Sequence, residues 1–281
     1  MADGLDCGGQ WLDLSRPAVV GVVNITPDSF SDGGTVTGAA SAVAQARRMV
    51  EEGAAMVDVG GESSRPGAAP VDEKEELRRI LPVVEALAEA LPVPISVDTC
   101  KPGVMRAAVA VGAGMINDIR ALNAPGALEA AADAGVPVCL MHMQGEPRTM
   151  QDAPRYGDVV GEVRDFLAGR IEAAAGAGIP QDRLVVDPGF GFGKSLRNNY
   201  ELLGRLDALV ELGVPVLVGM SRKSMIGNLL DRPLDQRLVG GAATAALAVF
   251  QGARLVRTHD VAATADAVRV AQAARRPDGI E

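Results

Sequence analysis

The segment AVVGVVNITPDSFSDGG, residues 18–34, contains the pattern that decides the fold. It begins with an apolar run over residues 18–24, which is typical of a buried strand. The run ends at Asn24 and continues as a polar loop with two carboxylates, three hydroxyls, a single Phe30 and two closing glycines. Because this loop has little apolar surface to bury, it indicates a functional site at the strand end, with a long surface connection as the alternative.

Similar apolar runs recur along the chain, and Ala-rich amphipathic segments separate most of them. Strands are predicted at residues 18–24, 56–60, 94–98, 115–117, 136–142, 184–187, 214–219 and 254–257. Helices are predicted at residues 39–53, 72–91, 102–111, 158–178, 199–213, 239–252 and 260–274. Strands that alternate with helices imply parallel pairing with helical crossovers. The pattern therefore predicts an α/β fold, a (β/α)8 TIM barrel of the usual size of about 250 residues, with an open doubly wound sheet as the alternative.

The chain is expected to form a single domain, because no low-complexity linker divides it. We expect an N-terminal segment at residues 1–17, the barrel at residues 18–276 and a short tail at residues 277–281. The N-terminal segment is expected to contain a short strand or plug around Trp11 and Leu14.

Composition narrows the class of partner. The chain has 281 residues and a formal net charge of -9, so neither a nucleic acid nor an anionic membrane surface is expected to bind it. No apolar run is long enough for a membrane span, and no leader is evident. The three cysteines, Cys7, Cys100 and Cys139, have no metal-ligand or redox spacing. We therefore expect a cytoplasmic protein without disulfides that binds small molecules.

Polar residues stand at or just after the end of nearly every predicted strand. They are Asn24, Asp58, Asp98, Asn117, His142, Asp187, Ser221, Arg257 and His259. In a barrel these strand ends converge on one mouth, which is where active sites lie. Each residue alone could instead be a helix N-cap or a turn residue. Acids and amides predominate over the Ser and Thr that capping accepts equally, so the set favours a site.

The ordered motifs resemble those of the dihydropteroate synthase family. They are NITPDSFSDGG from residue 24, GGESSRPGA from residue 60, SVDTCKP from residue 96, IND from residue 116, LMHMQG from residue 140, DPGFGFGK from residue 187, GMSRK from residue 219 and RTHD from residue 257. The resemblance implies a (β/α)8 barrel that joins (7,8-dihydropterin-6-yl)methyl diphosphate to 4-aminobenzoate and releases diphosphate in folate biosynthesis. It also implies a magnesium ion and a homodimer.

Hydrogen-bonding chemistry and the resemblance together indicate a pterin site. The pterin edge offers a 2-amino group and N3–H as donors, and the carboxylate of Asp187 can accept both. The resemblance places Asp98 and Asn117 on other ring positions and Lys223 beside the ring carbonyl. His142 has no metal-partner motif and is expected to line the mouth or the core.

Two cationic residues, Arg257 and His259, flank Thr258 at the end of the last predicted strand. Alternation along an extended chain puts both on one side, where a guanidinium can bind diphosphate as a fork. The resemblance adds Asn24 as the magnesium ligand.

The predicted diphosphate group also contains Asn24 and Thr258, and the loop after the second predicted strand adds Ser64 and Arg65 to it. An aminobenzoate site is expected from Ser64, Pro66, Phe192 and Ser224, with Phe192 as an apolar wall. Ser224 is expected at the start of the helix that follows the seventh strand. Many relatives have Thr where this chain has Ser64, which affects binding strength more than role. Sulfonamides, as arylamine analogues, are expected to compete with aminobenzoate.

No Ser or Cys nucleophile with a motif-linked base is evident, so a dissociative reaction is expected. Asp98 and Asp187 would stabilise positive charge on the pterin, while magnesium, Arg257 and His259 would stabilise the departing anion; Lys223 belongs to the same catalytic group. Two alternatives stay open: a pterin-binding methyltransferase that uses methyltetrahydrofolate and a corrinoid partner, and a non-catalytic paralogue of the synthase.

Overall fold

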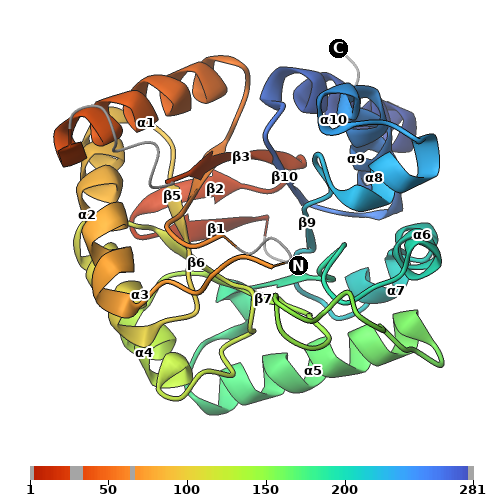
Figure 1. Ribbon diagram of the computed structural model, residues 1–281, viewed down its shortest axis with the longest axis horizontal. Helices are drawn as coiled ribbons and strands as arrows, with labels where there is room; N and C mark the ends of the chain where they lie inside the picture. The colour runs from red at the N-terminus through yellow and green to blue at the C-terminus, as the bar shows by residue number, and fades with distance from the viewer. Residues whose placement is uncertain (1–2, 26–33, 64–66, 278–281) are drawn as a thin grey trace.

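Eight parallel strands form the centre of the molecule, in a computed structural model that describes residues 3–25, 34–63 and 67–277 (Figure 1). They are β3 (Ala18–Asn24), β4 (Met56–Gly60), β5 (Ile95–Asp98), β6 (Met115–Asp118), β7 (Val138–Met141), β8 (Leu184–Asp187), β9 (Leu217–Val218) and β10 (Leu255–Thr258). Their order in the sheet is β8-β7-β6-β5-β4-β3-β10-β9. A parallel bridge between Val186 and Val216 joins the two outermost strands. The sheet therefore closes into the expected TIM barrel, and the open-sheet alternative is wrong.

Helices surround the barrel and cover the outer faces of its strands (Figure 1). They are α1 (Gly34–Glu51), α2 (Glu73–Ala90), α3 (Pro102–Ala110), α4 (Ala127–Ala134), α5 (Val159–Gly176), α6 (Leu196–Gly204), α7 (Asp207–Val210), α8 (Ser224–Leu230), α9 (Leu238–Gln251) and α10 (Val261–Arg275). The strands are apolar because parallel strands in a barrel are buried on both faces. Outward residues such as Val57, Val97 and Leu140 pack in one large core with the helices.

Several helix boundaries differ from the sequence prediction. α4 was not predicted, and it follows Gly126, whose φ is 79°. α8 begins at Ser224, which agrees with the helix start expected there. The helix predicted at residues 199–213 is two helices, α6 and α7, separated at Arg205. α1 begins at Gly34, where the glycine-containing sequence lacks the apolar periodicity that helix prediction uses.

An N-terminal hairpin closes one end of the barrel. β1 (Gly4–Cys7) and β2 (Gln10–Asp13) pair antiparallel, which agrees with the expected short strand. The hairpin forms one apolar cluster with residues that begin several barrel strands. The cluster contains Leu5, Cys7, Leu12, Leu14, Ala18, Val20, Met56, Met115, Cys139, Val185, Leu217 and Leu255. Since Met56, Met115 and Leu255 are the first residues of their strands, the hairpin lies at the N-terminal end, and the C-terminal mouth is left for other groups.

The inner face of the barrel changes from apolar to polar two residues further along the strands. Side chains along a strand alternate between its faces, so residues two apart point the same way. Asp58 therefore follows Met56 inward, Asn117 follows Met115, and Arg257 follows Leu255. This alternation places a polar layer, formed by Asp58, Asn117 and Arg257, next to the apolar cluster around the hairpin. We call that cluster the plug.

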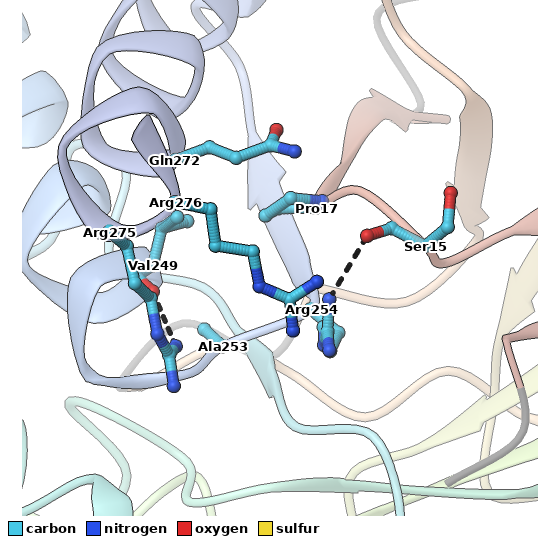
Figure 2. Close-up of a pocket in the computed structure, with 8 residues that line it drawn as sticks. All are labelled: Ser15, Pro17, Val249, Ala253, Arg254, Gln272, Arg275 and Arg276. Carbon is cyan, nitrogen blue, oxygen red and sulfur yellow. Dashed lines mark hydrogen bonds between the residues drawn. The ribbon is translucent and has the colours of Figure 1, made fainter. Parts of the chain in front are cut away.

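A cavity of about 20 Å³ lies near the start of β10, away from the mouth (Figure 2). Its lining residues are Ser15, Pro17, Val249, Ala253, Arg254, Gln272, Arg275 and Arg276. Nη1 of Arg254 donates to the carbonyls of Leu14 and Ser15, at 3.3 Å each, and Nη1 of Arg275 donates to the carbonyl of Val249 at 3.1 Å. A space of this size holds about one water molecule, and the arginines serve to satisfy chain carbonyls.

All three cysteines are free, as the sequence predicts. Within residues 3–25, 34–63 and 67–277, no helix has the length and apolar character needed to cross a membrane.

The hairpin should contribute measurably to stability. Leu5 is 1% exposed in the plug, so Leu5→Ala should lower the free energy of unfolding by about 2–5 kcal/mol. Trp11→Ala, at a hairpin residue that is 64% exposed, is the matched control and should change it much less. Urea unfolding of both variants measures the difference. Equal, small effects would show that the hairpin does not belong to the core.

Candidate active site

Strand register brings the predicted polar residues together at the C-terminal mouth. Asp98 of β5 pairs in register with Asn117 of β6 and with Gly60 of β4, while Asp187 lies at the end of β8 opposite Met141. These residues are up to about 130 positions apart in the sequence. They meet because parallel strands place their C-terminal ends at one edge of the barrel. The predicted convergence is therefore present in the fold.

Arg257 lies at the centre of this group. Its Nε donates to Oδ2 of Asp58 at 2.6 Å, and its Nη2 donates to Oδ2 of Asp98 at 3.0 Å. Burial lowers the pKa of Arg257, but the two carboxylates outweigh it and hold that pKa above its usual range. Nη1 has no partner among the residues that the structure describes, so it stays available to a ligand.

Asp58 was grouped with the strand-end residues but received no predicted role. Its side chain is 1% exposed, and Nδ2 of Asn117 also donates to its Oδ2, at 3.4 Å. Asp58 thus connects Arg257 with Asn117. Its place two residues after Met56 on an apolar strand is the signal that sequence reasoning could have used, because an acid at an inward position needs a partner.

Asp98 shares Arg257 with Asp58 and is largely buried. Burial raises the pKa of Asp98 to about 7, although Arg257 acts to lower it. The nearby Asp58, Glu76 and Asp118 add to the increase by repulsion. A carboxyl group whose charge is this costly gains from any ligand that donates hydrogen bonds or brings positive charge.

Asp187 and Lys223 form the opposite side of the mouth. Oδ1 of Asp187 accepts the N–H of Gly189 at 2.7 Å. Burial raises the pKa of Asp187, with Lys223 as the strongest opposing influence. Nζ of Lys223 donates to the carbonyl of Phe190 at 2.6 Å and lies 4.6 Å from the centre of the Phe192 ring. Burial lowers the pKa of Lys223 to about 8, with Asp187 raising it.

Acceptor oxygens without donors are the most informative feature of the mouth. Oδ1 of Asp58 and Oδ1 of Asn117 are buried, and neither has a hydrogen-bond partner in the described part of the chain. Buried acceptors of this kind are rare because leaving them unpaired costs about 1–3 kcal/mol each. Their presence indicates a ligand that supplies N–H groups.

A cavity of about 210 Å³ adjoins Asp98 between the loops after β4, β5, β6 and β7. Its wall includes Glu62 and Glu76, which share an ion pair with Lys101. Oε1 of Glu62 also accepts the N–H of Val71 at 3.2 Å. These contacts anchor the start of the loop between β4 and α2.

The predicted diphosphate residues have different surroundings. His259 contacts Ser221, with 3.2 Å between Nδ1 and Oγ and 3.2 Å between its backbone N–H and Oγ. The hydroxyl of Thr258 lies 2.9 Å from that of Thr264 on α10 and accepts the N–H of Asp260. The hydroxyl of Thr258 is thus used within the protein, and alternation along β10 turns its side chain away from the side of Arg257.

The predicted metal ligand, Asn24, is exposed at the C-terminal end of β3. The described residues contain no cluster of three or more His, Cys, Asp or Glu side chains that could hold a metal ion. Magnesium commonly keeps several waters and binds through one or two protein oxygens and substrate phosphates. A single amide oxygen at the mouth fits that donor set.

Part of the predicted aminobenzoate site is visible. Phe192 is buried against Met141 and Met150, and Ser224 is exposed at the first residue of α8. Ser64, Arg65 and Pro66 lie outside the described residues, as does the loop 26–33 with Phe30. His142 is buried, as predicted, with its ring edge-on to Phe166 at 4.9 Å between centroids.

Comparison with known proteins shows close relatives. A model of the pterin binding enzyme family matches residues 20–259. The dihydropteroate synthase of Escherichia coli (strain K12) is 56% identical over 265 residues, which cover 94% of each chain. A structure of the Xanthomonas albilineans dihydropteroate synthase with 4-aminobenzoic acid has a TM-score of 0.91 at 57% identity, covering 98% of this chain and 99% of that one. A Yersinia pestis dihydropteroate synthase structure with a sulfonamide drug complex has a TM-score of 0.92 at 52% identity, covering 97% and 99%.

Asp98 should make folding stability depend on pH. Its pKa rises from 3.8 when unfolded to about 7 when folded, so between these values the folded protein holds a proton that the unfolded chain has lost. Stability from this group is therefore lost as pH rises through that window. Asp98→Asn removes the titration, so the variant should gain more than about 1 kcal/mol relative to wild type between pH 4.5 and pH 8.

Urea unfolding at both pH values measures this gain. Asp182→Asn, at an exposed position before β8, is the control for a general charge effect. A difference between Asp98→Asn and wild type that stays constant with pH would contradict the raised pKa of Asp98.

Proposed function

The chain belongs to the pterin-binding enzyme family as a dihydropteroate synthase, and from that premise we propose which of its residues bind each substrate. The enzyme is a transferase of folate biosynthesis that condenses (7,8-dihydropterin-6-yl)methyl diphosphate with 4-aminobenzoate and releases diphosphate. We propose that the pterin binds to the polar layer formed by Asp58, Asn117 and Arg257. The supporting observation is the pair of buried acceptors without donors, Oδ1 of Asp58 and Oδ1 of Asn117.

Asp187 is proposed to accept the donor edge of the pterin. Its Oδ1 accepts the N–H of Gly189 and keeps a second lone pair, so Oδ1 and Oδ2 together can accept the 2-amino group and N3–H. Asp98 likewise uses Oδ2 for Arg257 and can offer Oδ1 to the ring. Asn117 completes the set, and Lys223 faces the ring carbonyl as a donor. A site of paired buried donors and acceptors discriminates strongly against ligands that lack the partner groups.

The diphosphate is proposed to bind where Arg257 and His259 meet the mouth. Asp58 and Asp98 occupy Nε and Nη2 of Arg257, so its Nη1 group can donate to phosphate oxygens. Ser221 orients the His259 ring through the contact with Nδ1. Ser64 and Arg65 are proposed as further ligands, and Asn24 as the protein ligand of magnesium. When bound, magnesium supplies positive charge that neutralises the diphosphate oxygens.

The residues of the mouth support a dissociative reaction. As the bond between the methylene carbon and the diphosphate oxygen breaks, positive charge spreads into the pterin ring. The carboxylates of Asp98 and Asp187 stabilise that charge electrostatically, while Arg257 stabilises the departing anion. The amine nitrogen of aminobenzoate then bonds to the methylene carbon and loses a proton.

Aminobenzoate is proposed to lie against Phe192 and near Ser224. Phe192 offers an apolar face that is fixed by Met141 and Met150, and Lys223 lies over the same ring. Ser64 and Pro66 would supply the remaining wall. Sulfonamides, which share the arylamine, are proposed to compete for this place.

A diphosphate-release assay separates this function from its two alternatives. Release should require both the pterin diphosphate and 4-aminobenzoate and should yield one dihydropteroate for each diphosphate. Methyl transfer from methyltetrahydrofolate to a corrinoid, without diphosphate release, would favour the methyltransferase. Tight pterin binding without turnover would favour a non-catalytic paralogue. The charged group around Arg257 favours the synthase, because a methyltransferase has no diphosphate to bind.

Asp187→Asn should abolish most turnover. The substituted amide can still accept the N–H of Gly189, but its NH2 group then faces the donors of the pterin. We expect kcat/KM for the pterin diphosphate to fall by about 10²-fold or more. The exposed Asp182→Asn is the control in the same release assay. Unchanged kcat/KM in Asp187→Asn would remove Asp187 from the pterin site.

We propose a homodimer in the cytoplasm, where the three free cysteines would stay reduced. Support for the dimer comes from exposed apolar side chains on α8, α9 and the short helix between them. They are Leu229, Leu230, Leu234, Leu238, Val239, Leu247 and Phe250. Exposed apolar residues on two helices that contact each other are typical of an interface between subunits.

Val239→Glu should weaken the dimer, because Val239 is 78% exposed within this set and a buried charge opposes association. Light scattering should find a dimer in the wild type and a larger monomer fraction in the variant. Trp11→Glu, at the closed end of the barrel, is the matched control. A wild-type monomer at micromolar concentration would contradict the proposal.

A further inference from the structure

Lys194 is a buried lysine to which the proposed mechanism gives no task. It lies in the loop after β8 and is 2% exposed. Nζ lies 2.9 Å from Nδ1 of His142, 2.9 Å from the carbonyl of Gly189 and 3.0 Å from the carbonyl of Phe192. In its ammonium form Lys194 has three donors and no acceptor, so these three acceptors match it completely. They favour the charged form, whereas burial lowers the pKa of Lys194 to about 7. Among the described residues no carboxylate forms an ion pair with Lys194.

His142 can accept this hydrogen bond only as a neutral ring with its proton on Nε2. Burial lowers the pKa of His142 to about 3, and the charge of Lys194 lowers it further in the same direction. The ring therefore stays neutral at physiological pH and keeps a lone pair on Nδ1. The backbone N–H of His142 also donates to the carbonyl of Asp187 at 2.9 Å, so His142 joins β7 to β8 by two routes.

The loop that Lys194 holds has an unusual backbone. Gly189, Gly191 and Gly193 have φ values of 67°, 79° and 61°. A Cβ at Gly189 would lie 1.9 Å from the carbonyl oxygen of His142, and one at Gly193 would lie 2.2 Å from that of Gln144. Glycine is therefore required for close approach to β7 and its loop. Because glycine also leaves the chain the most conformational freedom, this loop needs fixed contacts to hold one shape.

The shape of this loop determines two groups of the substrate sites. The N–H of Gly189 fixes Oδ1 of Asp187, and the carbonyl of Phe190 accepts from Lys223. The ring of Phe192 lies beneath Nζ of Lys223. Of these, Asp187 is also held by its strand, whereas the carbonyl of Phe192 has Lys194 as its donor within the described residues.

We propose that Lys194 and His142 form a positioning pair that fixes the glycine loop and so places Phe192 and Lys223 for the incoming aminobenzoate. This inference rests on the proposed aminobenzoate site. The pair touches neither substrate and acts through the loop. Its loss should therefore impair aminobenzoate more than the pterin, because Asp187 keeps its place at the end of β8.

Lys194→Met tests the donor, since Met fills similar volume without N–H groups. The KM for aminobenzoate should rise by about tenfold or more, while the calorimetric Kd for a pterin without diphosphate should change by less than about threefold. His142→Leu, which removes the acceptor, should act in the same direction. His142→Asn, which can return an acceptor oxygen to the position of Nδ1, should restore much of the wild-type KM.

The double variant Lys194→Met with His142→Leu should be no worse than Lys194→Met alone, because the two residues act as one unit. If Lys194→Met fails to fold, the comparison of His142→Leu with His142→Asn carries the test. Equal aminobenzoate KM values in those two variants would overturn the proposal. So would equal losses of both ligands in a folded Lys194→Met, which would indicate a purely structural lysine. Wild-type diphosphate release is measured alongside, so failure of the proposed function is recognised separately.

Discussion

The rest of the mouth depends on the ion pairs of Arg257 with Asp58 and Asp98. Burying two carboxylates in a barrel is costly unless a cation is buried with them, and Arg257 supplies that cation with its fork geometry. The pairing leaves one oxygen of each carboxylate and one nitrogen of the guanidinium for a ligand. The free enzyme therefore holds its charged groups in place before substrate arrives, which reduces the reorganisation that the reaction requires.

The residues that stabilise the barrel and the residues of the active site lie at different positions along the same strands. The hairpin and the first inward residues form an apolar cluster at the N-terminal end, and the next inward residues form the charged layer. The charged layer weakens the fold, because Asp98 carries a raised pKa and buried acceptors lack donors. The plug at one end and the outer core between strands and helices offset that weakness. A substrate that supplies N–H donors and positive charge satisfies the groups that folding leaves unsatisfied.

Much of this arrangement could be predicted from the sequence. The bounds of β3, β4 and β8 match the apolar runs, because strands buried on both faces read as continuous apolar segments. Asp98, Asn117, Asp187 and Arg257 were predicted at the mouth because strand ends converge in any barrel. The short helix α4 was missed because its eight residues, mostly alanine, are too few to show a clear apolar period. Lys194 and His142 are 52 residues apart in the sequence, and no local pattern marks them as a pair. The pairing of Asp58 with Arg257 could not be predicted either, because it depends on the register of the strands.

The most direct test of the account is the state of the Arg257 guanidinium in the ligand-free enzyme. Nuclear magnetic resonance of ¹⁵N-arginine-labelled protein can assign its Nε–H signal by comparison with Arg257→Lys. We expect a hydrogen-bonded Nε–H that exchanges slowly with water at neutral pH in the wild type and rapidly in Asp58→Asn. A rapidly exchanging Arg257 Nε–H in the wild type would show that the guanidinium is not held by Asp58, and would contradict the claim that the charged mouth is assembled before substrate binds.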